Sequence, residues 1–309
     1  MAGDVNFTLV QLRYFATAAE ACSMTAAAQQ LRVSQSAVST AVSQLEHSLQ
    51  VQLLIRHHAK GLSLTAAGSR FLQELKNFLA HADDLAETAR GLGTRLSGEL
   101  MIGCFLSLSP FLLPRLFAGL AEQHPDLRVQ AIEGETEELQ EALLNGRCEL
   151  ALMYEMDLAE PLTTEQVTVA PPYVIVPPRH RFAKRKGVRI AELAEDPFVL
   201  YDLPHSREYF LSLTESTGVS VQPRYRSSNY ETVRSLVANG QGYSILNQRP
   251  VRDTTYDGGQ VVTLPLLDPV PPLPVVLAYL RNTRLTRRAQ AFAEFCRELL
   301  RGEDRPAEG

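Results

Sequence analysis

The sequence predicts an N-terminal all-α winged helix-turn-helix with a long linker helix, followed by a C-terminal α/β domain made of two subdomains. Up to about residue 92, apolar residues recur at intervals of three and four, which is typical of amphipathic helices. Beyond residue 98, short apolar runs alternate with helical segments, which predicts a mainly parallel sheet. The glycine-containing stretch GLGTRLSGEL separates the two parts and is interpreted as a linker.

The composition is that of a globular protein with more than one domain. Of 309 residues, 45% are hydrophobic and 21% are charged, which is enough for a sizeable core. The first residues lack a basic segment followed by an apolar core, so no secretion signal is expected. The longest nearly uncharged run, residues 100–114, contains two prolines and is too short to span a bilayer, so no membrane segment is expected.

The spacing of cysteines and histidines indicates whether the chain can hold a metal or form disulfides. The four cysteines are far apart without a CxxC pair, and the seven histidines form no HxxxH or HExxH motif. We therefore expect reduced thiols in a cytoplasmic protein, with no metal and no cofactor. Cys104 lies in an apolar strand, where a buried inert thiol is favoured over a redox sensor.

Net charge does not single out a half that binds a polyanion. The chain carries −5; residues 1–95 hold eight Lys/Arg against seven acids, and the remainder holds 22 against 28, giving +1 and −6. Any contact with nucleic acid must therefore depend on the placement of individual basic side chains.

Residues 9–21 form an amphipathic pattern and predict the first helix. Ser23 or Thr25 then caps a short alanine-rich helix that ends near Leu31. A three-residue turn leads to residues 34–49, SQSAVSTAVSQLEHSL, which predict a third helix. Such an arrangement is a helix-turn-helix, whose third helix enters the major groove of DNA.

The third helix combines a buried stripe with an uncharged exposed face. Val38, Val42 and Leu45 recur at helical spacing, which leaves hydroxyls and amides outside, where Lys and Glu are usual. Short hydroxyls allow close approach to phosphates, and Gln35 can make two hydrogen bonds to adenine. The alternative is that these small residues pack against another helix. The residues predicted here to contact double-stranded DNA are Arg32, Ser34, Gln35, Ser36, Ser39 and Thr40.

Residues 51–65, VQLLIRHHAKGLSLT, place two apolar runs around a polar turn and predict a wing. A solvated hairpin without DNA contact is the alternative. The wing residues predicted to lie near a phosphate or the minor groove are Arg56, His57, His58 and Lys60.

A long helix is predicted from Thr65, a good N-cap, to about Arg90. Its apolar residues alternate at intervals of four and three, which indicates a heptad seam that needs a partner helix. A palindromic DNA site favours a two-fold dimer, whereas packing on its own domain is the alternative. The residues predicted to mediate dimerisation are Phe71, Leu75, Phe78, Ala82 and Leu85.

In the second part, ELMIGC, RVQAIEG and CELALMY predict strands with helices between them. A further unit runs from PYVIVPP through PFVLYD and YETVRSLVANG to YSILN, and the chain returns at LPVVLAYL to a last helix, RRAQAFAEFCRELL. Ligands of such sheets bind at the carboxyl ends of strands, here between the two units.

These motifs resemble the LysR-type transcriptional regulators. AAAQQLRVSQSAVSTAVSQLEHSL, LLIR and LSLTAAG are similar to the winged helix-turn-helix of that family. LLPRLFAGLAEQHPDLRVQAIEGETEEL and LVANGQGYSIL are similar to its effector domain, whose fold resembles periplasmic solute-binding proteins. The sequence departs from the family at Thr40, where arginine is frequent, at LQVQLLI, where Gly-x-Pro-Leu-Phe is usual, and at His57 and His58. These departures concern DNA contact and leave the fold intact.

The resemblance implies a domain organisation and partners. The implied partners are palindromic promoter DNA, a small-molecule effector, RNA polymerase and further copies of the chain, as a dimer or tetramer. The implied domains are a winged helix-turn-helix at 1–65, a dimerisation helix at 66–92, a hinge at 93–98, an effector domain at 99–300 (subdomain I about 99–170 and 268–300, subdomain II about 171–267) and a disordered tail at 301–309.

The resemblance also implies an effector pocket between the subdomains. Several relatives place an arginine near the position of Tyr154 to bind a carboxylate, but this chain has Glu155 and Asp157, so an aromatic or amphipathic effector is favoured. An ordinary core or surface role is the alternative for each residue. The implied pocket residues are Phe105, Ser107, Thr136, Met153, Tyr154, Tyr201, Asp202, His205, Asn229 and Tyr230.

Two other classes of protein explain less of the sequence. A solute-binding transport component accounts for residues 98–300 alone and requires export. An enzyme is not expected, because the chain has neither GxSxG nor GxxxxGK[ST]. The sequence therefore predicts a regulator whose DNA-bound geometry is controlled by a small molecule in the interdomain cleft.

Overall fold

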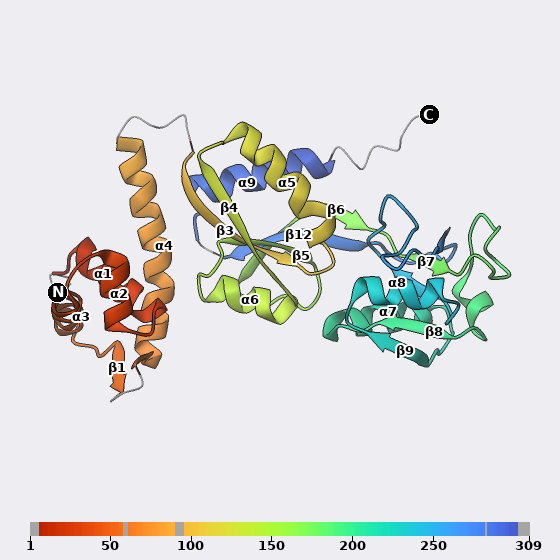
Figure 1. Cartoon of the computed structure of the whole chain (residues 1–309), viewed down its shortest axis with the longest axis horizontal. Helices are drawn as coiled ribbons and strands as arrows, with labels where there is room; N and C mark the ends of the chain where they lie inside the picture. The colour runs from red at the N-terminus through yellow and green to blue at the C-terminus, as the bar shows by residue number, and fades with distance from the viewer. Residues whose placement is uncertain (1–5, 58–60, 90–95, 282, 302–309) are drawn as a thin grey trace. The chain divides into compact units, whose positions relative to one another are not determined.

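The structure is a computed structural model that describes residues 6–57, 61–89, 96–281 and 283–301 (Figure 1). Two compact units are considered separately. The first contains the described residues up to Leu96 together with 144–147 and 285–287. The second contains Ser97–Leu143, Cys148–Arg284 and the described residues from Arg288 onward.

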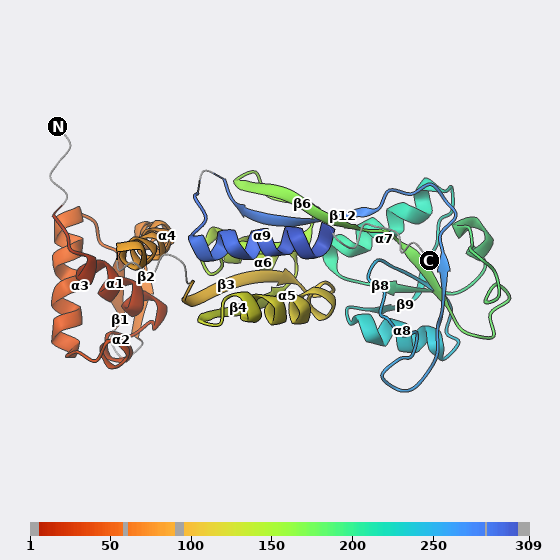
Figure 2. The same cartoon turned by 90° about the horizontal axis from the view of Figure 1, so that it is seen from above.

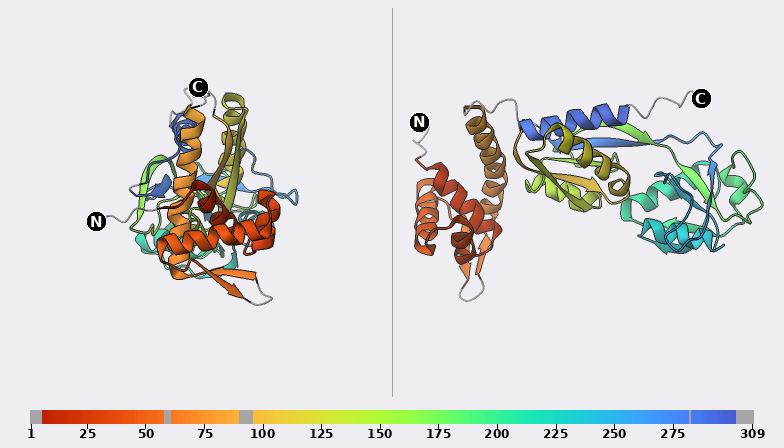
Figure 3. Two further views of the ribbon diagram at one scale, coloured as in Figure 1. Left: turned by 90° about the vertical axis from the view of Figure 1, so that its left-hand side faces the viewer. Right: turned by 45° about the horizontal axis from the view of Figure 1, so that its top comes forward.

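The first unit is a helix-turn-helix with a β-hairpin wing and a long helix, as the sequence predicts. Its helices begin where polar side chains can accept a backbone N–H: Thr8, Ser23 and Ser34 each cap the helix that follows. The hairpin is antiparallel and extends from the helices (Figure 3). Its elements are α1 Leu9–Glu20, α2 Met24–Leu31, α3 Gln35–Leu49, β1 Leu54–His57, β2 Gly61–Leu64 and α4 Ala66–Ala89.

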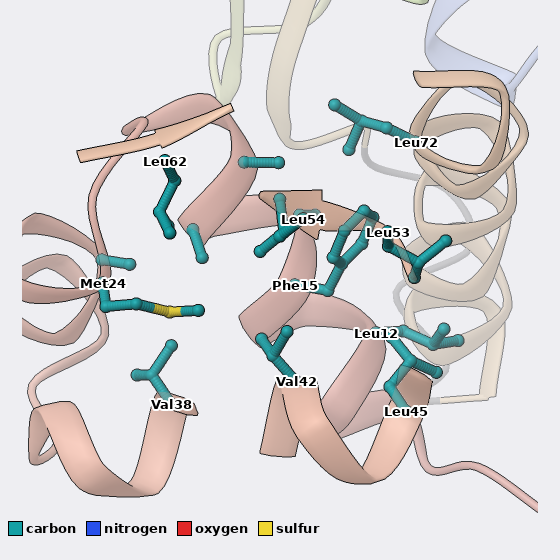
Figure 4. Close-up of a cluster of buried hydrophobic side chains, with 14 of the residues drawn as sticks. Leu12, Phe15, Met24, Val38, Val42, Leu45, Leu53, Leu54, Leu62 and Leu72 are labelled. Atoms are coloured by element: carbon teal, nitrogen blue, oxygen red, sulfur yellow. The ribbon is translucent and has the colours of Figure 1, made fainter. Parts of the chain in front are cut away.

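The core of the first unit lies between α1, α3 and the base of the wing (Figure 4). The predicted stripe Val38, Val42 and Leu45 is fully buried and packs with Phe15 of α1. Because this stripe is held inward, the opposite face of α3 is fixed outward.

Polar contacts join α3, the wing and α4. The Glu46 carboxylate accepts hydrogen bonds from the backbone N–H groups of Leu53 and Leu54, at 2.8 and 2.9 Å. Gly68, in the first turn of α4, lies so close to the wing that a Cβ there would be 2.0 Å from the carbonyl oxygen of Leu53. Thr65 Oγ1 donates to the carbonyl of Gln52 at 2.8 Å and accepts from Gly68 N–H at 2.9 Å.

The first subdomain of the second unit has a five-stranded sheet in the order β4-β3-β5-β12-β6 within the described residues. Figures 1 and 2 show α5 and α9 on one side of this sheet and α6 on the other. Its elements are β3 Gly98–Phe105, α5 Ser109–Gln123, β4 Leu127–Gly134, α6 Thr136–Leu144, β5 Leu150–Tyr154, β6 Leu162–Ala170, β12 Leu273–Leu280 and α9 Arg287–Arg301.

One strand of this sheet runs against the other described strands. β3 is parallel to β4 and β5, but β12 is antiparallel to both of its neighbours, β5 and β6. The reason is connectivity: β12 brings the chain back from the second subdomain, so it enters the sheet from the opposite end to β3 and β5. Because β6 is antiparallel to β12, it runs in the same direction as β3, β4 and β5, so the described sheet is mainly parallel, as expected, with β12 as the one antiparallel strand.

The second subdomain carries a three-stranded sheet, in which β7 is antiparallel to β10 and β11, and a parallel pair, β8 and β9. Its elements are β7 Tyr173–Val176, a 3-10 turn Ile190–Leu193, β8 Phe198–Tyr201, α7 Pro204–Ser216, β9 Pro223–Ser227, α8 Tyr230–Ala238, β10 Ser244–Leu246 and β11 Val262–Pro265. In the part of the chain that the structure describes, no helix has the length and apolar character needed to cross a membrane.

Candidate functional site

The exposed face of α3 presents the side chains that the sequence predicts for DNA contact. Gln35, Ser36 and Thr40 are exposed, and Ser39 is half-buried beside them. Ser34 also has a structural role, because its hydroxyl caps α3 by accepting from Ala37 N–H at 3.2 Å. The same hydroxyl lies 2.9 Å from Ser36 Oγ. This face contributes no large side chain to the core, so it is available to a partner.

Arg32 ends α2 in a left-handed backbone conformation with φ of 55°, and its side chain is exposed in the turn before α3. A left-handed conformation is unfavourable for a residue with a Cβ. Here the turn requires it, since the N–H groups of Arg32 and Val33 close the end of α2 on the carbonyls of Gln29 and Ala28. The helix-turn-helix turn therefore carries a basic side chain at its outer edge.

The wing lies beside the recognition helix. The Arg56 guanidinium donates to Ser43 Oγ of α3 at 3.1 Å, so it stands against the exposed face of that helix. His57 Nε2 lies 2.7 Å from Ser63 Oγ across the hairpin. The predicted wing residues His58 and Lys60 lie outside the described residues.

The helix α4 divides its apolar residues between two environments. Leu75 is 3% exposed and belongs to the core of the first unit, and the ring of Phe71 lies 5.5 Å from that of Phe15. This is packing on its own domain, the alternative to a seam. Phe78 and Leu85 are 53% and 72% exposed, and Ala82 is half-buried.

In the second unit, a hollow of about 290 Å³ brings together residues of both subdomains. Four predicted effector residues line it, namely Ser107, Tyr154, Tyr201 and Tyr230. Sequence reasoning missed seven others. These are Ser206, Tyr209, Phe210, Leu246, Asn247, Gln248 and Leu273.

Hydroxyls and amides connect the walls of this pocket. Tyr154 OH lies 3.2 Å from Ser107 Oγ and accepts from Gln248 Nε2 at 3.2 Å. Tyr230 OH donates to the backbone carbonyl of Gln248 and lies 3.1 Å from Tyr173 OH. Burial is the first cause that raises the pKa of Tyr154, Tyr201 and Tyr230, so these phenols keep their protons at neutral pH.

The other predicted effector residues lie outside the pocket lining. Phe105 and Met153 are buried in strands of the sheet, and Thr136 is buried at the start of α6. Asp202 forms an ion pair with Arg207, and His205 Nδ1 lies 3.1 Å from the Asp157 carboxylate. Asn229 caps α8 through Thr232 N–H at 2.9 Å. Packing, pairing or capping accounts for five of these six, whereas Thr136 Oγ1 is buried with no hydrogen-bond partner among the described residues.

A signal for two of the missed residues was present in the sequence. Asn247 and Gln248 are polar residues directly after the short apolar strand YSIL, and strand carboxyl ends are where ligands bind in such domains. Tyr209 and Phe210 lie on α7, whose mixed sequence PHSREYFLSLTES has no clear apolar stripe. That helix was therefore not predicted.

The helix-turn-helix unit and the two-subdomain unit with its pocket together define a class, the bacterial regulators that couple DNA recognition to a ligand-binding domain. A family described as "Bacterial regulatory helix-turn-helix protein, lysR family" matches residues 9–69, and "LysR substrate binding domain" matches residues 93–301. The chain belongs to the LysR family of transcriptional regulators. This family is made of regulators rather than enzymes.

Relatives with known names agree with this assignment. A probable hydrogen peroxide-inducible genes activator of Streptomyces viridosporus is 31% identical over 95% of both chains. The dual regulator OxyR of Escherichia coli is 28% identical over 95% of this chain and 93% of its own. Among solved structures, HinK of Pseudomonas aeruginosa is 36% identical, covers 96% of this chain and 99% of its own, and has a TM-score of 0.65. A full-length OxyR variant of Pseudomonas aeruginosa is 25% identical over 94% of this chain and 98% of its own, with a TM-score of 0.77.

Proposed function

We propose that this regulator binds palindromic promoter DNA through α3 and the wing, and that a small aromatic or amphipathic molecule in the pocket of the second unit controls its DNA-bound geometry. The observation that carries the proposal is the outward face of α3, which presents Gln35, Ser36, Ser39 and Thr40 and which Arg56 of the wing contacts at Ser43. The core of the domain does not need this face. The protein works in the cytoplasm as a dimer or tetramer that contacts RNA polymerase.

Control by a bound molecule is favoured over control by thiol oxidation, although several relatives are named for hydrogen peroxide. The four cysteines all lie in described residues; Cys104, Cys148 and Cys296 are buried, whereas Cys22 is exposed in the first unit. Burial raises the pKa of the Cys104 thiol to about 12 and also raises that of Cys296. The reactive form of cysteine is the thiolate, so these two thiols are poor sensors at neutral pH.

A ligand can shift an equilibrium only through different affinities for two arrangements, and such coupling is typically worth about 1 to 3 kcal/mol. The pocket meets the structural requirement, since Ser107 and Tyr154 come from the first subdomain and Tyr201 and Tyr230 from the second. A molecule held by all four changes how the subdomains are disposed.

Replacing Gln35 by alanine should weaken binding to the specific DNA site by about 1 to 3 kcal/mol and relax preference at one base pair, because a two-hydrogen-bond contact is lost. The measurement is a titration of wild-type and single-base-substituted sites at fixed salt concentration. Gln44→Ala is the matched control, since Gln44 is also exposed but lies on the opposite side of α3, nine residues further on. If the wild type and Gln35→Ala show equal affinities and footprints, Gln35 is not among the residues that recognise DNA bases.

Tyr201→Phe should weaken effectors about tenfold, because it deletes one hydroxyl from the pocket wall and leaves the ring in place. Compounds are found by a thermal-shift screen of the full chain, since a bound molecule raises the melting temperature. Affinity for DNA without compound should stay at the wild-type level. Tyr256→Phe is the control, because Tyr256 is exposed and lies outside the pocket lining.

A compound that binds tightly in the pocket yet changes neither DNA binding nor transcription would disprove effector control. The alternative from the sequence, a small-molecule binder without a regulatory role for the pocket, then becomes the better account of the second unit.

A further inference from the structure

The pocket lining carries no formal charge. Its eleven residues are four tyrosines, one phenylalanine, two serines, two leucines, one asparagine and one glutamine. Arg249, which follows the lining residue Gln248, is exposed, and two other basic side chains of neighbouring segments already have partners. Arg207 is paired with Asp202, and Arg234 is paired with Glu231 at 2.7 Å and also donates to the carbonyls of Arg252 and Thr254. The lining therefore provides no cation for a ligand carboxylate.

The surroundings of Tyr201 also disfavour an anion. Its pKa is raised first by burial, then by Tyr154 and by the nearby Glu135 carboxylate, which opposes a second negative charge. A ligand carboxylate placed beside Tyr201 meets the same low-dielectric surroundings and the same repulsion. Both effects act against an anionic ligand and leave a neutral one unaffected.

One polar atom in the pocket wall lacks a partner. Asn247 Nδ2 donates to the carbonyl of Ala170 at 2.7 Å and to Tyr209 OH at 3.1 Å. Because a carbonyl can only accept, the first contact fixes which way the amide is turned. Asn247 Oδ1 is then buried with no hydrogen-bond partner among the described residues. A buried acceptor of this kind is satisfied when a ligand donates to it.

The size and the walls of the hollow restrict the shape of a ligand. The gaps between the side chains of the hollow hold about one water molecule, so a ligand enters only when the walls separate. The rings of Tyr201 and Tyr230 meet edge to face at 6.0 Å and 89°. Perpendicular aromatic walls suit a further flat ring.

We propose that this pocket selects an uncharged, single-ring aromatic molecule that donates a hydrogen bond to Asn247 Oδ1, and that it discriminates against aromatic carboxylates. This inference rests on the proposed effector function and names the chemical class of its ligand. The neutral lining, the unpaired acceptor and the perpendicular tyrosine rings act together: a flat ring packs against the tyrosines, its donor satisfies Asn247, and an anion finds no counter-charge.

Benzamide and benzoate test the inference, because they have nearly the same shape and differ in charge and in donor groups. Calorimetric titration of the full chain at pH 7 should show benzamide binding about tenfold or more tighter than benzoate. Asn247→Leu should lower benzamide affinity about tenfold, whereas Asn239→Leu, on an exposed residue outside the lining, should leave it unchanged. Gln248→Arg supplies a cation at the pocket wall and should reverse the preference toward benzoate.

Equal or tighter binding of benzoate by the wild type overturns the proposed class, and so does the absence of binding by both compounds. If a folded Asn247→Leu protein binds benzamide as the wild type does, the proposed hydrogen bond to Asn247 Oδ1 is wrong. If that variant does not fold, the Gln248→Arg variant tests the proposal instead, and an unchanged preference for benzamide in that variant contradicts it. Two further outcomes distinguish an error in the ligand class from an error in the proposed effector function. If benzoate binds more tightly than benzamide and Tyr201→Phe weakens benzoate binding, the pocket is an effector site for another chemical class of ligand. If pocket substitutions change neither ligand binding nor ligand-dependent DNA binding, the effector function itself is wrong.

Discussion

Replacing Glu46 by alanine is expected to lower the free energy of unfolding of the DNA-binding unit by about 2 to 5 kcal/mol. One carboxylate oxygen accepts from the backbone N–H groups of both Leu53 and Leu54, and both residues are buried. Removing the carboxylate leaves these two backbone N–H groups without an acceptor, in the segment that connects α3 to the wing. The measurement is denaturant unfolding of the full chain, followed by a probe in this unit and by specific DNA binding.

Glu46→Gln is the informative partner variant, because its amide oxygen can accept from the same two N–H groups. It should cost less than the alanine variant, by about 1 kcal/mol or more. Glu74→Ala controls for loss of a carboxylate, since Glu74 is exposed on α4. If Glu46→Ala unfolds like the wild type, water satisfies the two donors and the bridge contributes little to stability.

Phe78→Glu combined with Leu85→Glu should weaken self-association about a hundredfold or more. These two side chains are exposed in the single chain and lie seven residues apart on one side of α4. We propose that they form the apolar contact with a second copy, and a charge buried there without a partner costs several kcal/mol, where about 1.4 kcal/mol is a factor of ten. Sedimentation velocity across a concentration series measures the effect.

Ser69→Glu is the control for added charge, because Ser69 is exposed on the opposite side of α4. Leu75→Glu is a poor test of dimerisation, since Leu75 is buried in its own domain and the variant would unfold that domain instead. A double variant that sediments as the wild type at low concentration would place the oligomer contact in the second unit.

Local features of the first unit could be predicted because neighbouring residues determine them. Ser23 and Ser34 cap helices with their own side chains, the stripe Val38, Val42 and Leu45 follows from helical spacing, and the polar turn between apolar runs forms a hairpin. Glu46 lies within the segment that resembles the helix-turn-helix of the family. The reason for the glutamate became visible only with the structure, because its partners lie seven and eight residues away.

Features that depend on distant contacts were missed or misjudged. Leu75 fits a heptad seam by spacing, but it packs into the core of its own unit. Strand β6, LTTEQVTVA, is half-exposed along most of its length and lacks a continuous apolar signal. Four of the predicted effector residues line the pocket, and seven lining residues were missed. Three of the seven lie on α7, whose approach to the first subdomain no local pattern encodes.

The close fit of Gly68 against the wing has a mechanical consequence. The position has no room even for a methyl group beside the carbonyl of Leu53, and Thr65 and Glu46 tie the same stretch of backbone from either side. Within this unit, these contacts connect α4 rigidly to α3 through the base of the wing. When the long helix turns, we expect α3 to turn with it, so that under the proposed function the output is a change in the bend or spacing of bound DNA.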